Sequence, residues 1–159
     1  MNKQQEADLD RVLDGYERRD KRRQQEVDTR HRSERDFYDG FRRVVADVIK
    51  PEMARLAATL TARGHRCSIE EEAASATNEG YDRPGSVRFT FIPDQRYSQG
   101  REDPAAIFSA GSDMRVQIAY SAAVPAVVDP EAVPRDVELA DVTEDVVSGQ
   151  IVAMVKALL

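Results

Sequence analysis

Residues 87–93 read Val-Arg-Phe-Thr-Phe-Ile-Pro, which is the clearest strand pattern in this chain of 159 residues. Its apolar residues alternate with Arg88 and Thr90, as in a strand that has one buried and one polar face. Phe89 and Phe91 therefore face the same layer, and we expect both side chains to lie in a hydrophobic core.

Other strand patterns lie on both sides of this segment, and only loops separate them. Residues 65–70 and 114–120 show the same alternation, residues 106–109 fit a short strand, and residues 136–140 fit a short edge strand. Residues 73–85 and 94–103 have the polar composition of loops. Because no helix pattern separates the strands, the sequence favours an antiparallel sheet of three to five strands.

Helix patterns precede and follow the strands. The first has an apolar stripe at helical spacing: Phe37, Phe41, Val44, Val45, Val48, Ile49, Met53, Leu56 and Leu60. Pro51 interrupts this stripe, which predicts a kink or a short break in a long N-terminal helix. The second pattern covers residues 143–159 and begins at a favourable N-cap, Thr143. We predict an α+β fold in which both helices cover one face of the sheet.

The first 36 residues are almost entirely polar. The seam of a heptad repeat fits four apolar residues: Leu9, Leu13, Tyr16 and Val27. Four charged residues occupy positions of the same seam: Asp20, Arg23, Arg30 and Glu34. An ordinary dimeric coiled coil would not tolerate so many charges at its seam. We therefore expect residues 1–36 to form a charged projecting helix or a partly disordered arm, and residues 37–159 to form the α+β globular domain.

The composition argues against a membrane-spanning protein and against a secreted one. The longest uncharged run, residues 116–128, has 13 residues, whereas a membrane-spanning helix needs about 20. The single cysteine, Cys67, excludes a disulfide within the chain, and the N-terminal residues lack an apolar signal segment. We therefore expect a cytoplasmic protein with no membrane contact.

No known catalytic or ligand-binding motif is present. The sequence has neither a glycine-lysine phosphate loop nor a dinucleotide fingerprint. His65 and Cys67 point the same way on a strand, but a zinc site needs three or four ligands. Asp28 and His31 share a helix face that arginines surround, and residues 109–113 fit a hairpin turn better than a nucleophile loop. We therefore predict no catalytic residue, no metal site and no cofactor.

Charge is distributed unevenly along the chain, whose formal net charge is −6. Residues 18–35 carry eight basic and four acidic side chains, and the basic side chains include Arg18, Arg19, Arg22 and Arg23. These four arginines are candidates for contact with an anionic partner, including nucleic acid. An acidic cluster near the C-terminus either receives the basic helix of another copy or keeps the domain soluble: Asp129, Glu131, Asp136, Glu138, Asp141, Glu144 and Asp145.

Three functions remain open at this point. The first is a non-enzymatic interaction or adaptor protein that forms a homo-oligomer through its helices and also binds an unidentified protein. Its candidate oligomer interface is Phe37, Phe41, Val44, Val48, Val152 and Leu159. The second is a nucleic-acid-associated accessory protein. The third is an enzyme with a site in loops 73–85 and 93–104, formed by Tyr81, Asp82, Arg83, Arg96 and Tyr97.

The acidic composition, the helices and the antiparallel sheet together resemble the small acidic cytoplasmic dimers that chaperone secreted effectors. This resemblance covers composition and element types, and the long N-terminal helix departs from it. It implies a chaperone-like binding protein as an alternative form of the interaction hypothesis.

Overall fold

The structure, a computed structural model, describes residues 2–94, 102–125 and 135–159. The chain divides into two compact units, residues 1–36 and residues 37–159. The first unit is helical from Lys3 onward and belongs to helix α1 (Lys3–Val44). The second unit, called the globular unit below, contains the last turns of α1 and all the other elements.

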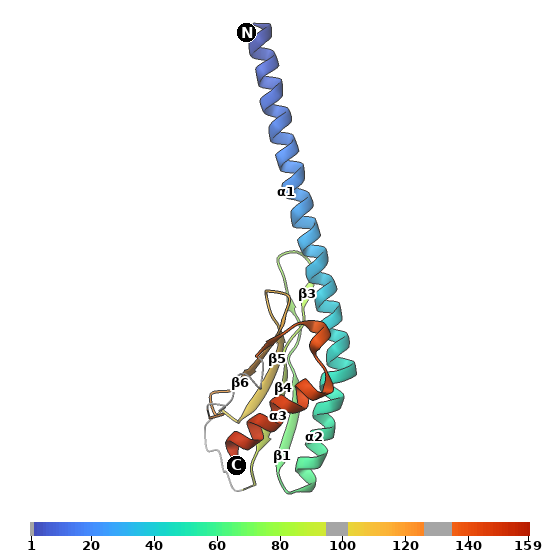
Figure 1. Cartoon of the computed structure of the whole chain (residues 1–159), viewed down its shortest axis with the longest axis vertical. Coiled ribbons are helices and arrows are strands. Elements are labelled where there is room, and N and C mark those ends of the chain that lie inside the picture. The colour runs from blue at the N-terminus through green and yellow to red at the C-terminus, as the bar shows by residue number, and fades with distance from the viewer. Residues whose placement is uncertain (1, 95–101, 126–134) are drawn as a thin grey trace. The chain divides into compact units, whose positions relative to one another are not determined.

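The globular unit is α+β, as predicted (Figure 1). After α1, its helical elements are the π-helical turn η1 (Val45–Ile49), α2 (Lys50–Ala62), the short 3-10 helix η2 (Leu139–Asp141) and α3 (Glu144–Leu158). Its strands are β1 (Arg66–Glu71), β2 (Ser75–Ala76), β3 (Asp82–Arg83), β4 (Val87–Ile92), β5 (Ala105–Ala110), β6 (Val116–Tyr120) and β7 (Asp136–Val137).

Five of the strands form one antiparallel sheet in the order β1-β4-β5-β6-β7. The register places Cys67 beside Phe91, Phe89 beside Ala106, and Phe108 beside Ile118. Side chains alternate between the two faces of a strand, so these pairs lie on one face of the sheet. Helix α2 packs against β1 and α3, and α3 packs against β5, so the helices cover this apolar face (Figure 1).

The core lies between the sheet and the helices. Its largest fully buried side chains are Phe41, Phe89, Phe91, Phe108, Ile49, Met53, Ile151 and Met154. Four of them are phenylalanines, which each bury a large apolar area in a chain whose other core residues are mostly small. Phe89 and Phe91 are both fully buried, as the strand pattern predicted.

The helical segment continues through Pro51 rather than breaking there. Proline has no backbone N–H and clashes with the carbonyl four residues before it. The chain accommodates Pro51 with the π-turn η1, in which the N–H of Lys50 donates to the carbonyl oxygen of Val45. The predicted kink near Pro51 therefore takes the form of one wider turn.

The π-turn also keeps one row of side chains in the core. Phe37, Phe41, Val45, Ile49 and Met53 follow one another at intervals of four residues, and all are buried. In a regular α-helix each such step rotates the side chain by about 40°, because one turn takes about 3.6 residues. The extra residue in the π-turn reverses part of this drift. Val44 and Val48, in the same predicted stripe, are only half-buried.

Helix α3 begins as the sequence predicts, because the hydroxyl of Thr143 accepts from the N–H of Val146 at 3.3 Å. A partly buried polar contact ties this helix to β6. The hydroxyl of Tyr120 donates toward Gln150, with the side-chain Oε1 at 2.6 Å and the backbone oxygen at 3.0 Å. Burial raises the pKa of Tyr120 to about 12, although the nearby charge of Arg135 lowers it somewhat.

Three local predictions are wrong. Residues 73–85 are not entirely loop, because β2 and β3 form a small two-stranded sheet there. The predicted edge strand over residues 136–140 ends at Val137, and η2 follows it. Two strands begin later than predicted, β1 at Arg66 rather than His65 and β6 at Val116 rather than Met114. The small sheet is held by contacts outside its own sequence, including the guanidinium of Arg42, which donates to the carbonyl oxygen of Asp82 at 2.8 Å.

Replacing Phe89 or Phe91 with Ala should lower the free energy of unfolding of the globular unit by about 3–5 kcal/mol, because each leaves a cavity in a fully buried layer. Chemical denaturation of the full chain measures this loss. Val12→Ala is the matched control, since Val12 is exposed and its truncation should change the stability by less than about 0.5 kcal/mol. Unchanged stability in both Phe variants would mean that β4 is misassigned.

Candidate functional site

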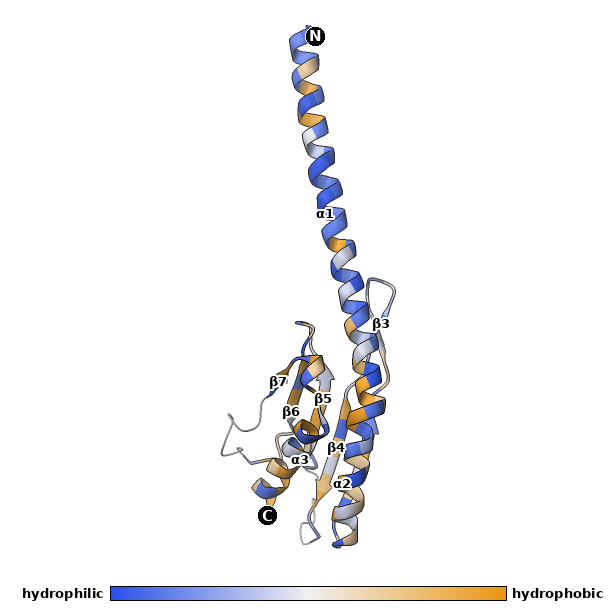
Figure 2. Cartoon of the chain, turned by 45° about the vertical axis from the view of Figure 1, so that its right-hand side comes forward, coloured by the Kyte–Doolittle hydropathy of each residue, from blue (hydrophilic) through white to orange (hydrophobic). Residues whose placement is uncertain are grey.

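The first unit carries an exposed apolar stripe. Leu9, Val12, Leu13 and Tyr16 follow one another at helical spacing and are 47%, 64%, 49% and 62% exposed. Figure 2 shows this part of α1 as mostly hydrophilic, with separate hydrophobic patches. We call Leu9, Val12, Leu13 and Tyr16 the α1 stripe. Single exposed apolar residues are normal on a protein surface, whereas the four members of the α1 stripe together cover one side of two consecutive turns.

The four candidate anion-binding arginines are exposed on the same helix. The Nε of Arg18 donates to the backbone oxygen of Asp14 at 3.2 Å, one turn earlier. Within the part of the chain that the structure describes, Arg19, Arg22 and Arg23 take part in no ion pair. Arg18 and Arg22 lie one turn apart, and Arg19 and Arg23 lie one turn apart on the adjacent side. At about 100° per residue the four side chains span about 140°, so they lie on one broad side of the helix.

The six residues of the predicted oligomer interface are in different environments. Phe37 and Phe41 are buried, and the sheet and helices of the same chain cover them. Val44 and Val48 are half-buried beside this core. Only Val152 and Leu159, on and just after α3, are exposed, at 41% and 74%. The structure thus does not bring the six residues together into one exposed patch.

A groove in the globular unit was not anticipated from the sequence. It has a volume of about 660 Å³ and lies between the α1–α2 segment and the edge strand β1. Its lining includes Phe41, Val45, Pro51, Ile69 and Gly85. Lys50 Nζ and Glu71 Oε2, both from lining residues, form an ion pair at 3.0 Å. The strand-end Glu71 and the helical Lys50 are far apart in sequence, so no local pattern indicated this contact.

His65 and Cys67, considered above for metal or nucleophile chemistry, lie at the start of strand β1. Nδ1 of His65 accepts from the backbone N–H of Asp94 at 3.3 Å, and its ring lies 5.2 Å from that of Phe91. Burial raises the pKa of the Cys67 thiol, which keeps it protonated and weakly nucleophilic. In residues 2–94, 102–125 and 135–159, no three His, Cys, Asp or Glu side chains gather as metal ligands would.

The loop residues considered for an enzyme site do not converge where they are described. The ring of Tyr81 packs 6.1 Å from that of Tyr38, and the backbone oxygen of Asp82 accepts from Arg42. Arg83 donates to the backbone oxygen of Ala110 at 2.6 Å. None of these three residues lines the groove beside β1. Arg96 and Tyr97 lie outside the described residues.

Residues 109–113, which the sequence favours as a hairpin turn over a nucleophile loop, include the turn between β5 and β6. The N–H of Gly111 donates to the backbone oxygen of Arg115 at 2.8 Å, which closes the hairpin. Gly111 is required there, because a Cβ would lie 2.9 Å from that same oxygen atom. Ser109 therefore lies in β5 and Ser112 lies in the hairpin turn that the sequence predicted.

The acidic cluster is partly neutralised within the chain. The guanidinium of Arg115 forms ion pairs with both Asp136 and Glu138. These interactions raise the pKa of Arg115, chiefly through the hydrogen bond to Asp136. Asp129 and Glu131 lie outside the described residues. Less negative charge is therefore left for a basic partner than the sequence suggested.

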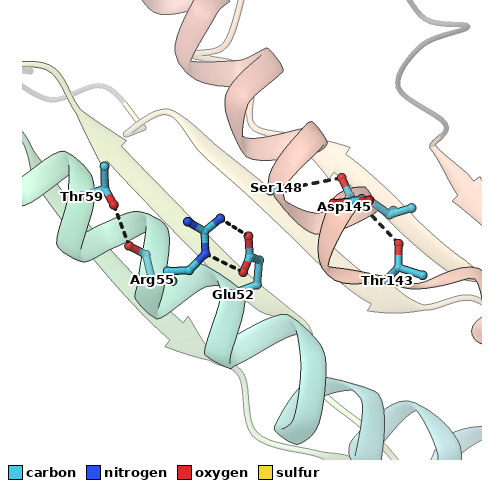
Figure 3. Close-up of polar contacts among 7 residues, drawn as sticks. Glu52, Arg55, Thr59, Thr143, Asp145 and Ser148 are labelled. Carbon is cyan, nitrogen blue, oxygen red and sulfur yellow. Dashed lines mark hydrogen bonds and ion pairs between the residues drawn. The ribbon is translucent and has the colours of Figure 1, made fainter.

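A further ion pair lies near the contact between α2 and α3 (Figure 3). Arg55 donates two hydrogen bonds to the carboxylate of Glu52, one of them from Nε at 2.9 Å. Glu52 is 6% exposed, and its hydrogen bonds to Arg55 hold the pKa of its carboxyl below the ordinary value, against a smaller opposing effect of burial. This pair joins successive turns of α2 and is a structural feature.

Comparisons of the chain with models of protein families, with curated proteins and with solved structures find no significant match. The function must therefore be inferred from the chain's own surfaces. No helix in the described part of the chain has the length and apolarity needed to cross a membrane. The α1 stripe is a group of neighbouring apolar side chains that the packing of the described residues leaves exposed.

Arg55→Gln should lower the stability of the globular unit at pH 7, because the covered Glu52 carboxylate loses two hydrogen bonds to an exposed partner. The pKa of Glu52 is lowered in the folded state, so this stabilisation is present above its ordinary value of 4.5 and is lost as the pH falls through the folded value. Denaturation curves of both proteins between pH 3 and pH 7 should converge at the acidic end. Arg66→Gln, an exposed arginine, is the control; a constant difference at every pH would contradict the assignment.

Proposed function

We propose that the protein is a non-enzymatic interaction protein, an adaptor that acts in the cytoplasm as a homo-oligomer through its helices. The single observation that carries this proposal is the α1 stripe, whose Leu9, Val12, Leu13 and Tyr16 are each about half exposed or more. Burying such side chains against another helix is favourable, and a second copy of the chain offers the same surface. A helix whose other sides are charged is well suited to contact a partner along one side only.

Two further observations support the proposal. The folded globular unit has its own core, so the first unit is not needed to complete it. The apolar residues at the start of α1 therefore have no role in packing the core of the described chain. The chain also has a single cysteine, Cys67, which is compatible with a reducing compartment.

A triple variant tests the role of the α1 stripe. Leu9→Gln, Leu13→Gln and Tyr16→Gln together remove three of the four apolar side chains of the stripe but keep good helix-forming residues. Sedimentation equilibrium of the wild-type chain at about 1–200 μM should show a concentration-dependent oligomer. The triple variant should be monomeric over the same range, with an unchanged melting temperature of the globular unit.

The matched control uses the other exposed apolar residues. Val152→Gln with Leu159→Gln removes a similar type of surface from α3 and its end. This variant should keep the wild-type oligomer if α1 is the interface, and should become monomeric if α3 is. A wild-type chain that stays monomeric up to 200 μM would remove the proposed homo-oligomer.

Nucleic-acid binding is the second candidate, and the exposed Arg19, Arg22 and Arg23 favour it. The formal charge of −6 and the acids interleaved among the arginines count against it. We therefore expect no retention of the full chain on double-stranded DNA or on RNA at about 150 mM salt. Retention that falls steeply with salt and disappears in the Arg18→Glu, Arg19→Glu, Arg22→Glu, Arg23→Glu variant would establish this candidate instead.

A further inference from the structure

The α1 stripe is one end of a longer seam on the same helix. With Leu13 at an a position and Tyr16 at a d position, the following seam positions are Asp20, Arg23, Val27 and Arg30. All of these residues are exposed in the first unit. Two oppositely charged residues thus separate the apolar stripe from an isolated apolar residue, Val27.

These charges disfavour a parallel pair of helices. In a parallel in-register dimer each seam residue meets its own copy. Asp20 would face Asp20, and Arg23 would face Arg23, both at positions that association removes from water. Like charges placed together in this way cost several kcal/mol. The seam can bury its apolar residues only in an arrangement that brings unlike charges together.

We propose that two copies of the chain associate through this seam as an antiparallel helix pair, with the two-fold axis between residues 21 and 22. This proposal rests on the proposed homo-oligomer and names its surface and register. In an antiparallel pair an a position meets a d position of the other helix. The register then places Asp20 opposite Arg23 of the second copy, and the two-fold axis repeats this contact in reverse.

The same register pairs one apolar residue of the stripe with another apolar residue, while Leu9 meets Glu34 of the second copy. Tyr16 meets Val27 of the second copy, so the end of the α1 stripe covers the isolated apolar residue. Leu13 meets Arg30, whose aliphatic stem can pack on the leucine while its guanidinium stays in water. Beside the seam, Arg19 meets Glu26 of the second copy, which adds an opposite-charge pair at the edge.

Sliding one helix along the other by a heptad repeat moves the two-fold axis by about 3.5 residues, and association in the resulting registers is less favourable. Shifting the two-fold axis to residue 18 makes Glu17 and Arg19 each meet its own copy. Moving it further toward the N-terminus pairs Asp10 with Glu17, and moving it toward the C-terminus pairs Glu26 with itself. The C-terminal shift also requires Phe37, which is buried in the globular unit. Only the register centred between residues 21 and 22 avoids like-charge contacts at these positions.

Cysteine cross-linking tests the register. In a background of Cys67→Ser, one variant carries Tyr16→Cys and another carries Val27→Cys. The proposed pair brings residue 16 level with residue 27 of the other copy, within reach of a disulfide. Two copies of the same variant keep their thiols about 17 Å apart along the axis, since 11 residues at about 1.5 Å each separate the two levels. Mild oxidation followed by mass spectrometry of the full chains detects the products.

A covalent dimer that forms only when the two variants are mixed is the expected result. Dimers from each variant alone would indicate a parallel pair and overturn the register. A wild-type oligomer that gives no cross-link in any mixture would also overturn it, while leaving the proposed homo-oligomer intact. A wild-type chain that is monomeric by sedimentation would overturn both.

Charge reversal gives a second measurement that keeps the apolar layers. Asp20→Arg places like charges opposite Arg23 twice in the dimer and should weaken association at least about tenfold. The double variant Asp20→Arg, Arg23→Asp restores unlike pairs and should recover most of the affinity. Asp14→Arg, which makes the same change away from the seam, is the control and should change the affinity less than about threefold. Equal effects of Asp20→Arg and Asp14→Arg, or no recovery in the double variant, would contradict the proposed contact.

Discussion

The packing of a single helix face against the sheet holds the globular unit together. Phe41, Ile49 and Met53 are fully buried on this face and belong to the same hydrophobic core as Phe89 and other side chains of the central strands. Since these residues recur every four positions, a regular α-helix would carry some of them away from the sheet. The π-turn before Pro51 reverses part of that rotation. The unit is therefore complete without residues 1–36, which leaves the start of α1 for other contacts.

The sequence predicted those parts of the fold that depend on local periodicity. Strand β4 was predicted because its apolar and polar residues alternate over a few positions. Helix α3 was predicted because its N-cap, Thr143, directly precedes it. The small β2–β3 sheet was not, because it depends on distant partners: Tyr81 packs on Tyr38 from α1. The π-turn was also not predicted in that form, since Pro51 alone does not distinguish a kink from a wider turn.

For the candidate interface too, the sequence showed the local spacing of the apolar residues but not which distant surfaces cover them. Leu9, Leu13 and Tyr16 were recognised from the sequence as seam residues, and the structure shows them exposed. Phe37 and Phe41 continue the same heptad, yet the chain's own core buries them. Heptad spacing by itself cannot show whether a helix face meets its own sheet or another copy. The charges along the seam carry the further information, because they fit an antiparallel partner and disfavour a parallel one.

The distance between spin labels at the start of α1 tests self-association through this helix most directly. A single label at Gln4→Cys, in the Cys67→Ser background, lies on the side of the helix opposite the seam. In the antiparallel pair two labels are separated by 35 residues along the axis, or about 50 Å, and pulsed dipolar spectroscopy should detect that separation. A separation of about 20–25 Å, typical of parallel neighbours with helix axes about 10 Å apart, or no dipolar signal at all, would contradict the account.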